Sequence, residues 1–229
     1  MPSAPSSPEA CPVIAIDGPS ASGKGTVAER VARELGFHYL DSGALYRLVT
    51  LVALERGASL DDAAGLARLA AEMDVRFPGA GAITLDGRDV TGPVRTEAVS
   101  AATSRVAAHP AVRGALLARQ RGFCRLPGLV ADGRDMGSVV FPDAALKVYL
   151  TADVATRAER RHKQLMEKGM YAKIQDVVEE LRRRDERDSS RPVAPLRHYP
   201  DAVFLDTSSL SVDAAVQAVI GRWRELARG

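Results

Sequence analysis

The residues best suited to chemistry lie in the segment 18–26, which contains a G-x-x-x-x-G-K pattern. The apolar run Val13–Ile16 before it predicts a buried parallel strand, and apolar residues recur at helical spacing from Lys24 to Leu35 after it. Between a strand and a helix, glycines let backbone N–H groups surround phosphate oxygens, and the helix start adds its positive dipole end. A chance glycine-rich turn is the alternative. The flanking elements favour a triphosphate site made by Gly18, Pro19, Ser20, Ala21, Ser22, Gly23, Lys24, Gly25 and Thr26.

Lys24 is expected to place its charge on the β- and γ-phosphates, where it matters most as negative charge redistributes in the transition state. Gly25 separates this lysine from the hydroxyl of Thr26, and the G-K-G-T ending resembles nucleoside monophosphate kinases more than GTPases or motor ATPases. We therefore expect Mg²⁺ near Thr26 and Asp132 to be held largely through water and the nucleotide phosphates.

Two further motifs follow predicted strands. The first, D-S-G-A-L-Y-R from Asp41, offers Ser42, Tyr46 and Arg47 to an acceptor phosphate, although a capped amphipathic helix would look similar. The second, D-G-R-D-M-G from Asp132, places an Arg-Asp pair between glycines; a surface ion pair in a turn is its alternative. Since parallel strands in such folds bind ligands at their carboxyl ends, we expect both motifs beside the phosphate loop, with Asp132 placed to orient waters of Mg²⁺.

A strongly charged run, R-R-R-D-E-R-D-S-S-R, extends from 182 to 191. A solvated helix face with i,i+3 and i,i+4 pairs explains most of it. For Arg184, Asp188 and Arg191 we favour the other interpretation, a lid that closes over the phosphates.

The elements that position these residues alternate between strand and helix, which predicts an α/β fold with a parallel sheet flanked by helices, of the P-loop NTPase type. We expect the core in residues 12–57, 125–167 and 197–229, behind a disordered tail at 1–11. Short antiparallel strands at 75–77 and 82–85 and helices at about 96–108 and 111–125 indicate an inserted sub-domain at 58–124. Residues 168–196 are expected to form a small helical lid.

Composition excludes several classes of function. Thirty-one basic and 29 acidic residues give a net charge of +2, which offers no bulk attraction for nucleic acid or membrane. No apolar run reaches the roughly 20 residues of a membrane span, and the N-terminus has no signal-peptide pattern. Cys11 and Cys124 indicate neither a disulfide framework nor a zinc site. We expect a cytoplasmic, monomeric protein.

The motifs G-P-S-A-S-G-K-G-T, D-S-G-A-L-Y-R, A-D-G-R-D-M-G and R-D-x-R-D-x-x-R-x-V-A-P-L, in this order, resemble bacterial cytidylate kinases. The resemblance runs from about Val13 to the C-terminus. It implies transfer of the γ-phosphoryl group of ATP to CMP or dCMP, with Mg²⁺, by Lys24, Arg134, Arg184 and Arg191. It also implies that the insertion and the lid bind the monophosphate and close the site, as in adenylate kinase-like folds.

The same resemblance implies individual roles. Ser104, Arg113 and Asp135 would read cytosine, while Ser42, Tyr46, Arg47, Arg134 and Arg191 would hold the monophosphate and Arg184 and Asp188 would reach the ribose and the lid. Cytosine offers an amino donor and two acceptors, which uracil partly reverses, so UMP should be a poor substrate at about 1–3 kcal/mol per swapped contact. Arg157 and Arg161 are candidates for the ATP side; a plain solvated helix face is their alternative.

Two rival functions remain at this point. A kinase of the same fold could act on UMP, AMP or a non-nucleotide alcohol. A regulatory NTP-binding module would hydrolyse slowly, gain nothing from an acceptor and present a basic binding face, which the near-neutral charge disfavours.

Overall fold

The computed structural model describes residues 11–79 and 81–228 of the 229-residue chain, so the tail expected at 1–11 lies almost wholly outside the described residues. Its centre is a five-stranded, all-parallel sheet with the order β2-β6-β1-β7-β8. This confirms the predicted α/β class. The strands are β1 (Val13–Asp17), β2 (His38–Asp41), β6 (Leu129–Gly133), β7 (Leu146–Thr151) and β8 (Val203–Asp206).

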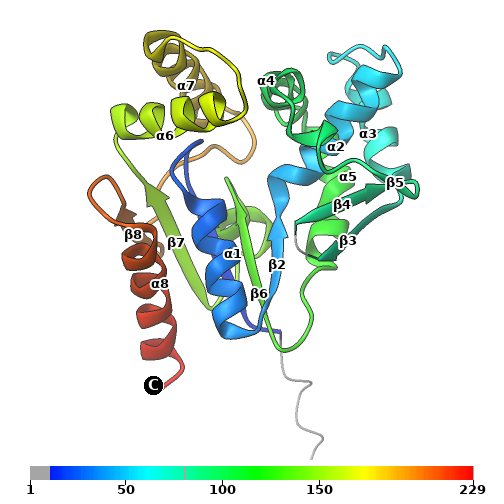
Figure 1. Ribbon diagram of the computed structural model, residues 1–229. Helices are drawn as coiled ribbons and strands as arrows, with labels where there is room; N and C mark the ends of the chain where they lie inside the picture. Colours follow the sequence, from blue (N-terminus) through cyan, green and yellow to red (C-terminus); the bar gives the residue numbers. More distant parts are fainter. Residues whose placement is uncertain (1–10, 80, 229) are drawn as a thin grey trace, which may run out of the picture.

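Helices cover both faces of the sheet because alternate residues of the strands point to opposite sides. Ile14 and Ile16 of β1 pack in one hydrophobic cluster with α1 (Lys24–Leu35) and α8 (Val212–Leu226). Val13 and Ala15 pack on the other face with α2 (Ser42–Glu55) and the segment that follows it. Figure 1 shows α1 and α8 together in front of the strands.

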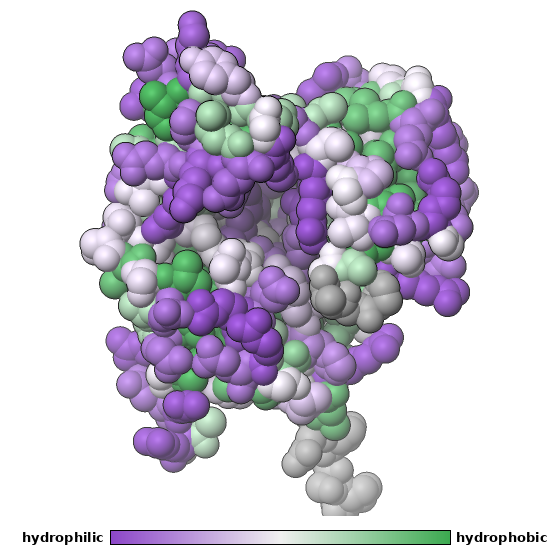
Figure 2. Space-filling view, viewed as in Figure 1, coloured by the Kyte–Doolittle hydropathy of each residue, from purple (hydrophilic) through white to green (hydrophobic). Residues whose placement is uncertain are grey.

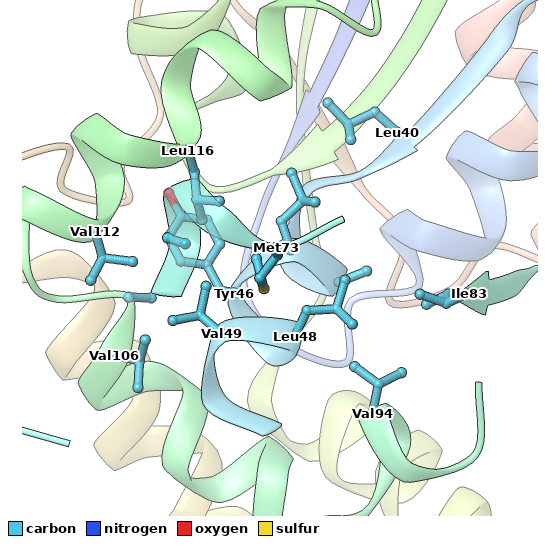
Figure 3. Close-up of a cluster of buried hydrophobic side chains, with 14 of the residues drawn as sticks. Leu40, Tyr46, Leu48, Val49, Met73, Ile83, Val94, Val106, Val112 and Leu116 are labelled. Atoms are coloured by element: carbon cyan, nitrogen blue, oxygen red, sulfur yellow. The ribbon is translucent and has the colours of Figure 1, made fainter. Parts of the chain in front are cut away.

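The insertion between α2 and β6 shares this second core rather than forming one of its own. Figure 3 shows Leu48 and Val49 of α2 among side chains such as Ile83, Val106 and Leu116. Apolar burial of this kind contributes about 25 cal/mol per Å² and holds the insertion against the sheet. Its elements are α3 (Ala63–Glu72), the antiparallel strands β3 (Val75–Gly79), β4 (Ala82–Leu85) and β5 (Arg88–Asp89), the short η1 (Pro93–Arg95), α4 (Glu97–Val106) and α5 (Pro110–Arg121).

Helix α3 has no counterpart in the sequence prediction. Its signals are present but brief: Asp62 caps it by accepting a hydrogen bond from Gly65 N at 2.9 Å, and Leu66 and Ala70 bury one face. Three turns with only two buried positions give a weak periodic signal.

Two helices rise beyond the carboxyl end of β7 (Figure 1). Helix α6 (Val154–Glu167) begins at Asp153, whose side chain accepts from Thr156 N at 2.8 Å, as its N-cap position predicts. Helix α7 (Ile174–Ser189) packs on α6 through a small cluster made by Ala158, Leu165, Val177 and Leu181. The charged run of the sequence lies on the second half of α7 and the two residues after it.

The expectation of no disulfide is wrong: Cys11 and Cys124 are joined, with their Cα atoms 5.9 Å apart. Their separation of 113 residues hides a proximity that the sheet creates. Because β1 and β6 pair in parallel, the residues before both strands meet, and Leu129 N donates to Pro12 O at 2.9 Å. In the described part of the chain, no helix combines the length and apolar character needed to cross a membrane.

Candidate functional site

The phosphate loop (residues 18–26) connects β1 to α1 at the carboxyl edge of the sheet. A Cβ atom on Gly18 would lie 1.9 Å from Leu150 O, so only glycine allows the chain to leave β1 against β7. Gly23 adopts a positive φ of 89°, and Ala21 adopts one of 58°, a conformation that costs a non-glycine residue energy. These two backbone conformations are compatible with a loop whose N–H groups surround phosphate oxygens.

Lys24 is the first residue of α1, and its ammonium group donates to Pro19 O at 3.3 Å across the phosphate loop. Burial lowers the pKa of this lysine well below its usual range, and the neighbouring Arg134 lowers it further. Asp132 acts in the opposite direction. The surroundings of Lys24 within the protein therefore disfavour its positive charge. The negative charge of a triphosphate would instead favour the protonated lysine.

Two carboxylates face the loop from neighbouring strands. Burial and then Asp41 raise the pKa of Asp132 to about 6, and Tyr39 donates a hydrogen bond of 2.9 Å to its Oδ1. Its Oδ2 lies on the side of Gly25, 3.6 Å from where a Cβ would stand. A pair of nearby carboxylates with one oxygen turned toward the phosphate loop suits Mg²⁺. Among the described residues no cluster of three or more His, Cys, Asp or Glu is placed to hold a metal ion.

A cavity of about 340 Å³ joins the phosphate loop to the acceptor motifs. This volume is ordinary for a small-molecule site. Its wall comes from the phosphate loop, from the motifs after β2 and β6, from α4 and α5 of the insertion, and from α6 and α7. Predicted residues that line it are Ala21, Gly23, Lys24, Gly25, Thr26, Ser42, Tyr46, Arg47, Ser104, Arg113, Asp132, Arg134, Asp135, Arg184, Asp188 and Arg191.

The inner end of the cavity is a buried polar cluster. Arg113 on α5 donates to Asp135 and also to Ala107 O at 3.0 Å, and its guanidinium lies 5.5 Å from the centre of the Tyr46 ring. Ser104 on α4 is buried beside them. An arginine, a carboxylate and a hydroxyl on three different elements can read a polar heterocycle by its donors and acceptors.

A second cluster lies between the cavity and α7. Arg134 donates from Nε to Asp188 at 2.9 Å and from a terminal nitrogen to Ser20 Oγ at 2.8 Å. Arg191 also donates to Asp188. Burial opposes ionisation of Asp188, but Arg134 and Arg191 hold its pKa below the usual value. Burial and Arg134 lower the pKa of Arg184 to about 10.

The three arginines of this cluster converge without enough negative charge. Among the described residues, the buried Nε atoms of Arg184 and Arg191, like that of Arg47, have no hydrogen-bond partner. Unpaired buried donors cost free energy, so this arrangement favours an anion in the cavity. On the other side of the cavity, Arg47 is paired with Asp41, the N-cap of α2.

The cavity continues into an open cleft of about 1320 Å³ between α1 and the β3–β4 sheet, and Gln164 borders both. Figure 2 shows the molecule hollowed here, with hydrophilic side chains around the opening. Arg161 lies in this cleft and is paired with Glu97.

Arg157 lies outside the cavity. Its buried guanidinium donates to Ala152 O at 2.9 Å, to Ser20 O at 3.2 Å and to both oxygens of Asp185 on α7. Arg160, which sequence reasoning did not select, donates to Ser22 O at 3.0 Å and to Thr207 O at 2.7 Å. Arg157 and Arg160 therefore hold the backbone of the phosphate loop in place through its carbonyl groups. A contact of Arg157 or Arg161 with ATP stays a prediction.

Comparison with known proteins identifies the relatives of the chain. The family model for cytidylate kinase matches residues 14–225. The chain is 57% identical over 214 residues to the cytidylate kinase of Chromobacterium violaceum, covering 93% of this chain and 96% of that protein. It is 57% identical to the cytidylate kinase of Paraburkholderia phymatum and 56% identical to that of Bordetella bronchiseptica, over 94% of this chain in both cases.

Solved structures give the same fold at low sequence identity. An uncharacterized protein from Eubacterium ventriosum matches with a TM-score of 0.51 at 13% identity, covering 92% of this chain and 97% of that chain. A gluconokinase from Sinorhizobium meliloti matches with a TM-score of 0.50 at 15% identity, covering 95% and 94%. These likenesses concern the architecture alone.

Proposed function

The chain belongs to the cytidylate kinase family, and on that premise we propose that it transfers the γ-phosphoryl group of ATP to CMP or dCMP, giving ADP and CDP or dCDP. The observation that carries the proposal is a cavity of about 340 Å³ that joins the phosphate loop to the Arg113–Asp135 cluster. Because both motifs line one cavity, a phosphate held by the phosphate loop and an acceptor bound at the cluster would be neighbours.

On the donor side, the phosphate loop holds ATP and Lys24 places its charge on the β- and γ-phosphates. No general base is required, because the CMP phosphate has a second pKa near 6 and is largely dianionic at neutral pH. Its oxygen attacks the γ-phosphorus in line, while the bond from the γ-phosphorus to the β,γ-bridging oxygen breaks and ADP leaves. Catalysis is then positioning and charge stabilisation by Lys24, Arg134, Arg184 and Arg191, as expected for a loose phosphoryl-transfer transition state.

On the acceptor side, Arg113 and Asp135 hold one another in the buried cluster and present donors and an acceptor to cytosine. The carboxylate of Asp135 and the hydroxyl of Ser104 accept from the exocyclic amino group, and Arg113 donates to the ring nitrogen and carbonyl. Ser42, Tyr46, Arg47, Arg134 and Arg191 hold the phosphate, and Asp188 and Arg184 reach the ribose. Uracil, with a carbonyl in place of the amino group, meets the wrong partners.

Mg²⁺ is expected beside Asp132 and Thr26, and when bound it supplies neutralisation of the charge on the β- and γ-phosphates. Asp132 would help to hold the ion; its Oδ1 accepts from Tyr39, and its Oδ2 lies on the side of Gly25. Asp41 adds negative charge to the same edge of the sheet, and its Oδ1 accepts from Ala44 N as the N-cap of α2.

Binding of ATP without an acceptor takes up protons from the solvent. Lys24 has a lowered pKa in the free protein, so above that value it is largely neutral. The bound triphosphate favours the protonated, charged form of Lys24. At about pH 8.5 the phosphates of ATP are already fully ionised and do not change their own protonation on binding. The number of protons taken up on binding ATP therefore approaches one per site. Calorimetry in buffers of different ionisation enthalpy measures this number. The variant Lys24→Met binds without uptake; uptake unchanged in the variant would contradict the role of Lys24.

Asp135→Asn lowers both turnover of CMP and preference for it. The amide has one NH₂ donor, which must point either toward the cytosine amino group or toward Arg113. In both orientations Arg113 loses its ionic partner. We expect kcat/KM for CMP to fall about 10- to 100-fold, at about 1–3 kcal/mol per mismatched contact. The CMP-to-UMP ratio, by which we mean kcat/KM for CMP divided by kcat/KM for UMP, falls with it. Steady-state rates for both acceptors measure the ratio. A ratio equal to that of the unsubstituted protein would remove Asp135 from base recognition.

We further propose that residues 12–57, 125–167 and 197–229 act as the core, 58–124 as the monophosphate-binding sub-domain and 168–196 as the lid. Closure of the lid keeps water from replacing CMP as acceptor. The phosphate loop and the acceptor motifs of one chain line the same cavity, which supports action as a monomer. The net charge of +2 gives no bulk attraction for nucleic acid or membrane. The chemistry of nucleotide synthesis favours the cytoplasm; the Cys11–Cys124 disulfide runs against a reducing compartment.

A further inference from the structure

Asp17 is a partly buried carboxylate that the reaction above does not use. It is the last residue of β1 and comes directly before Gly18, the first residue of the phosphate loop. It does not line the cavity. Its Oδ1 accepts a hydrogen bond from Met136 N and its Oδ2 accepts one from Gly137 N, both at 2.8 Å. One side chain thus connects the donor side of the site to the acceptor side.

Met136 and Gly137 belong to the segment that carries the acceptor-reading residues, residues 133–137, which we call the acceptor loop. They open the single turn η2 (Met136–Val140), whose first N–H groups have no partner within the turn. The two oxygens of Asp17 supply these partners. Asp17 therefore anchors the loop to β1, in addition to the backbone hydrogen bonds that Val139 N and Val140 N donate to Asp135 O.

The acceptor loop has little freedom on its other sides. A Cβ on Gly133 would lie 2.6 Å from Ser42 Oγ, and one on Gly137 would lie 3.1 Å from the side chain of Lys147. The loop is packed against α2 on one side and β7 on the other, and Asp17 sets its distance from the phosphate loop. Between these contacts the loop presents Arg134 to Ser20 and Asp135 to Arg113.

The geometry favours the ionised carboxylate. Each oxygen accepts from a separate N–H group. An amide has only one acceptor oxygen, and a protonated acid turns one of its oxygens into a donor. Burial raises the pKa of Asp17 to about 7, and the hydrogen bonds from Gly137 and Met136 oppose that rise.

We propose that Asp17 is a positioning residue that fixes the acceptor loop relative to the phosphate loop and so places Arg134 and Asp135 for CMP. It touches neither substrate. This inference rests on the roles proposed above for Arg134 and Asp135. The consequence is specific: loss of the anchor moves the groups that read the acceptor, while the phosphate loop keeps its own contacts.

The test compares Asp17→Asn with Asp135→Asn and with two controls. Asp62→Asn makes the same chemical change at the exposed cap of α3, and Val219→Ala removes buried volume from α8, remote from the site. For each protein we would measure the KM for ATP and kcat/KM for CMP and UMP. Asp17→Asn is expected to lower kcat/KM for CMP on the order of 100-fold, since a misplacement of about 1 Å can cost that much. The CMP-to-UMP ratio falls, and the KM for ATP stays close to that of the unsubstituted protein.

Each other outcome is decisive. If Asp135→Asn changes the CMP-to-UMP ratio and Asp17→Asn does not, the positioning role is wrong and the proposed function stands. If neither changes the ratio, the assigned role of Asp135 fails, and the inference fails with it. A general loss that raises the KM for ATP equally, or that Val219→Ala reproduces, shows Asp17 to be merely structural.

A second variant covers the case in which Asp17→Asn does not fold. Gly137→Ala keeps the carboxylate and presses the acceptor loop away from the side chain of Lys147. The inference predicts the same fall in the CMP-to-UMP ratio, with the KM for ATP retained. An unchanged ratio in this folded variant would overturn it.

Discussion

Replacing Arg134 by alanine lowers kcat/KM for CMP about 100- to 1000-fold and leaves the protein folded. The side chain reaches Asp188, Ser20 and the carbonyl of Gly133, and in the proposed reaction its fork turns to the acceptor phosphate. Removing one charged donor aimed at a transferring group costs two to three orders of magnitude in comparable sites, or about 3–4 kcal/mol.

The fold survives this change because Asp188 keeps Arg191 as a partner and the nearby Arg184 loses a repulsive neighbour. Thermal unfolding followed by circular dichroism checks this. Arg183→Ala is the matched control: the same substitution on the exposed face of α7, where Arg183 pairs with Glu179. Its rate should equal that of the unsubstituted protein. A kcat/KM for Arg134→Ala that matches the control would place Arg134 away from the acceptor.

Replacing Lys24 by methionine lowers kcat about 1000-fold, the second large effect. The ammonium group is expected to contribute most in the transition state, so turnover falls more than nucleotide affinity. Steady-state rates at saturating ATP and CMP measure it. Lys163→Met, on the exposed surface of α6, is the control for the substitution itself. A kcat for Lys24→Met within about tenfold of the control would mean that the lysine only binds.

The variant Lys24→Met should also be more stable than the unsubstituted protein when no ligand is present. The folded-state pKa of Lys24 lies below its unfolded value, so the folded protein binds fewer protons between the two and its free energy of unfolding rises with pH across that window. Below the window the charged lysine is a penalty to folding. Methionine removes the penalty, so the melting temperature at neutral pH should rise. A lower melting temperature would contradict the assigned electrostatics.

How far the sequence predicted this fold depended on the strength of each local pattern. β1, α1 and β7 follow from apolar runs and caps that the structure retains, such as the positive φ of 68° at Gly36 after α1. Helix α3 buries only Leu66 and Ala70, too few to show a period. The Cys11–Cys124 pair depended on strand order, which short strands do not encode locally.

The site shows the same division. Gly23, Lys24 and Arg134 belong to contiguous motifs, so residue type and spacing are enough to predict that they are site residues. Tyr39 and Asp17 do not, because each acts through a partner far along the chain, Asp132 for Tyr39 and the backbone of Met136 and Gly137 for Asp17. The only available signal for Asp17 was its place at the carboxyl end of β1, where ligand sites of parallel sheets form. Tyr39, the second residue of β2, had no such signal.

The release of ADP with CMP, dCMP, UMP and AMP as acceptors, at equal concentrations and with ATP and Mg²⁺, tests the central claim most directly. The cluster of Arg113 and Asp135 predicts fast turnover of CMP or dCMP, with UMP and AMP slower by at least the factor of about 10 to 100 that one or two swapped hydrogen bonds supply. Equal rates for all four acceptors would contradict the cytosine assignment, and no stimulation by any of them would contradict the kinase.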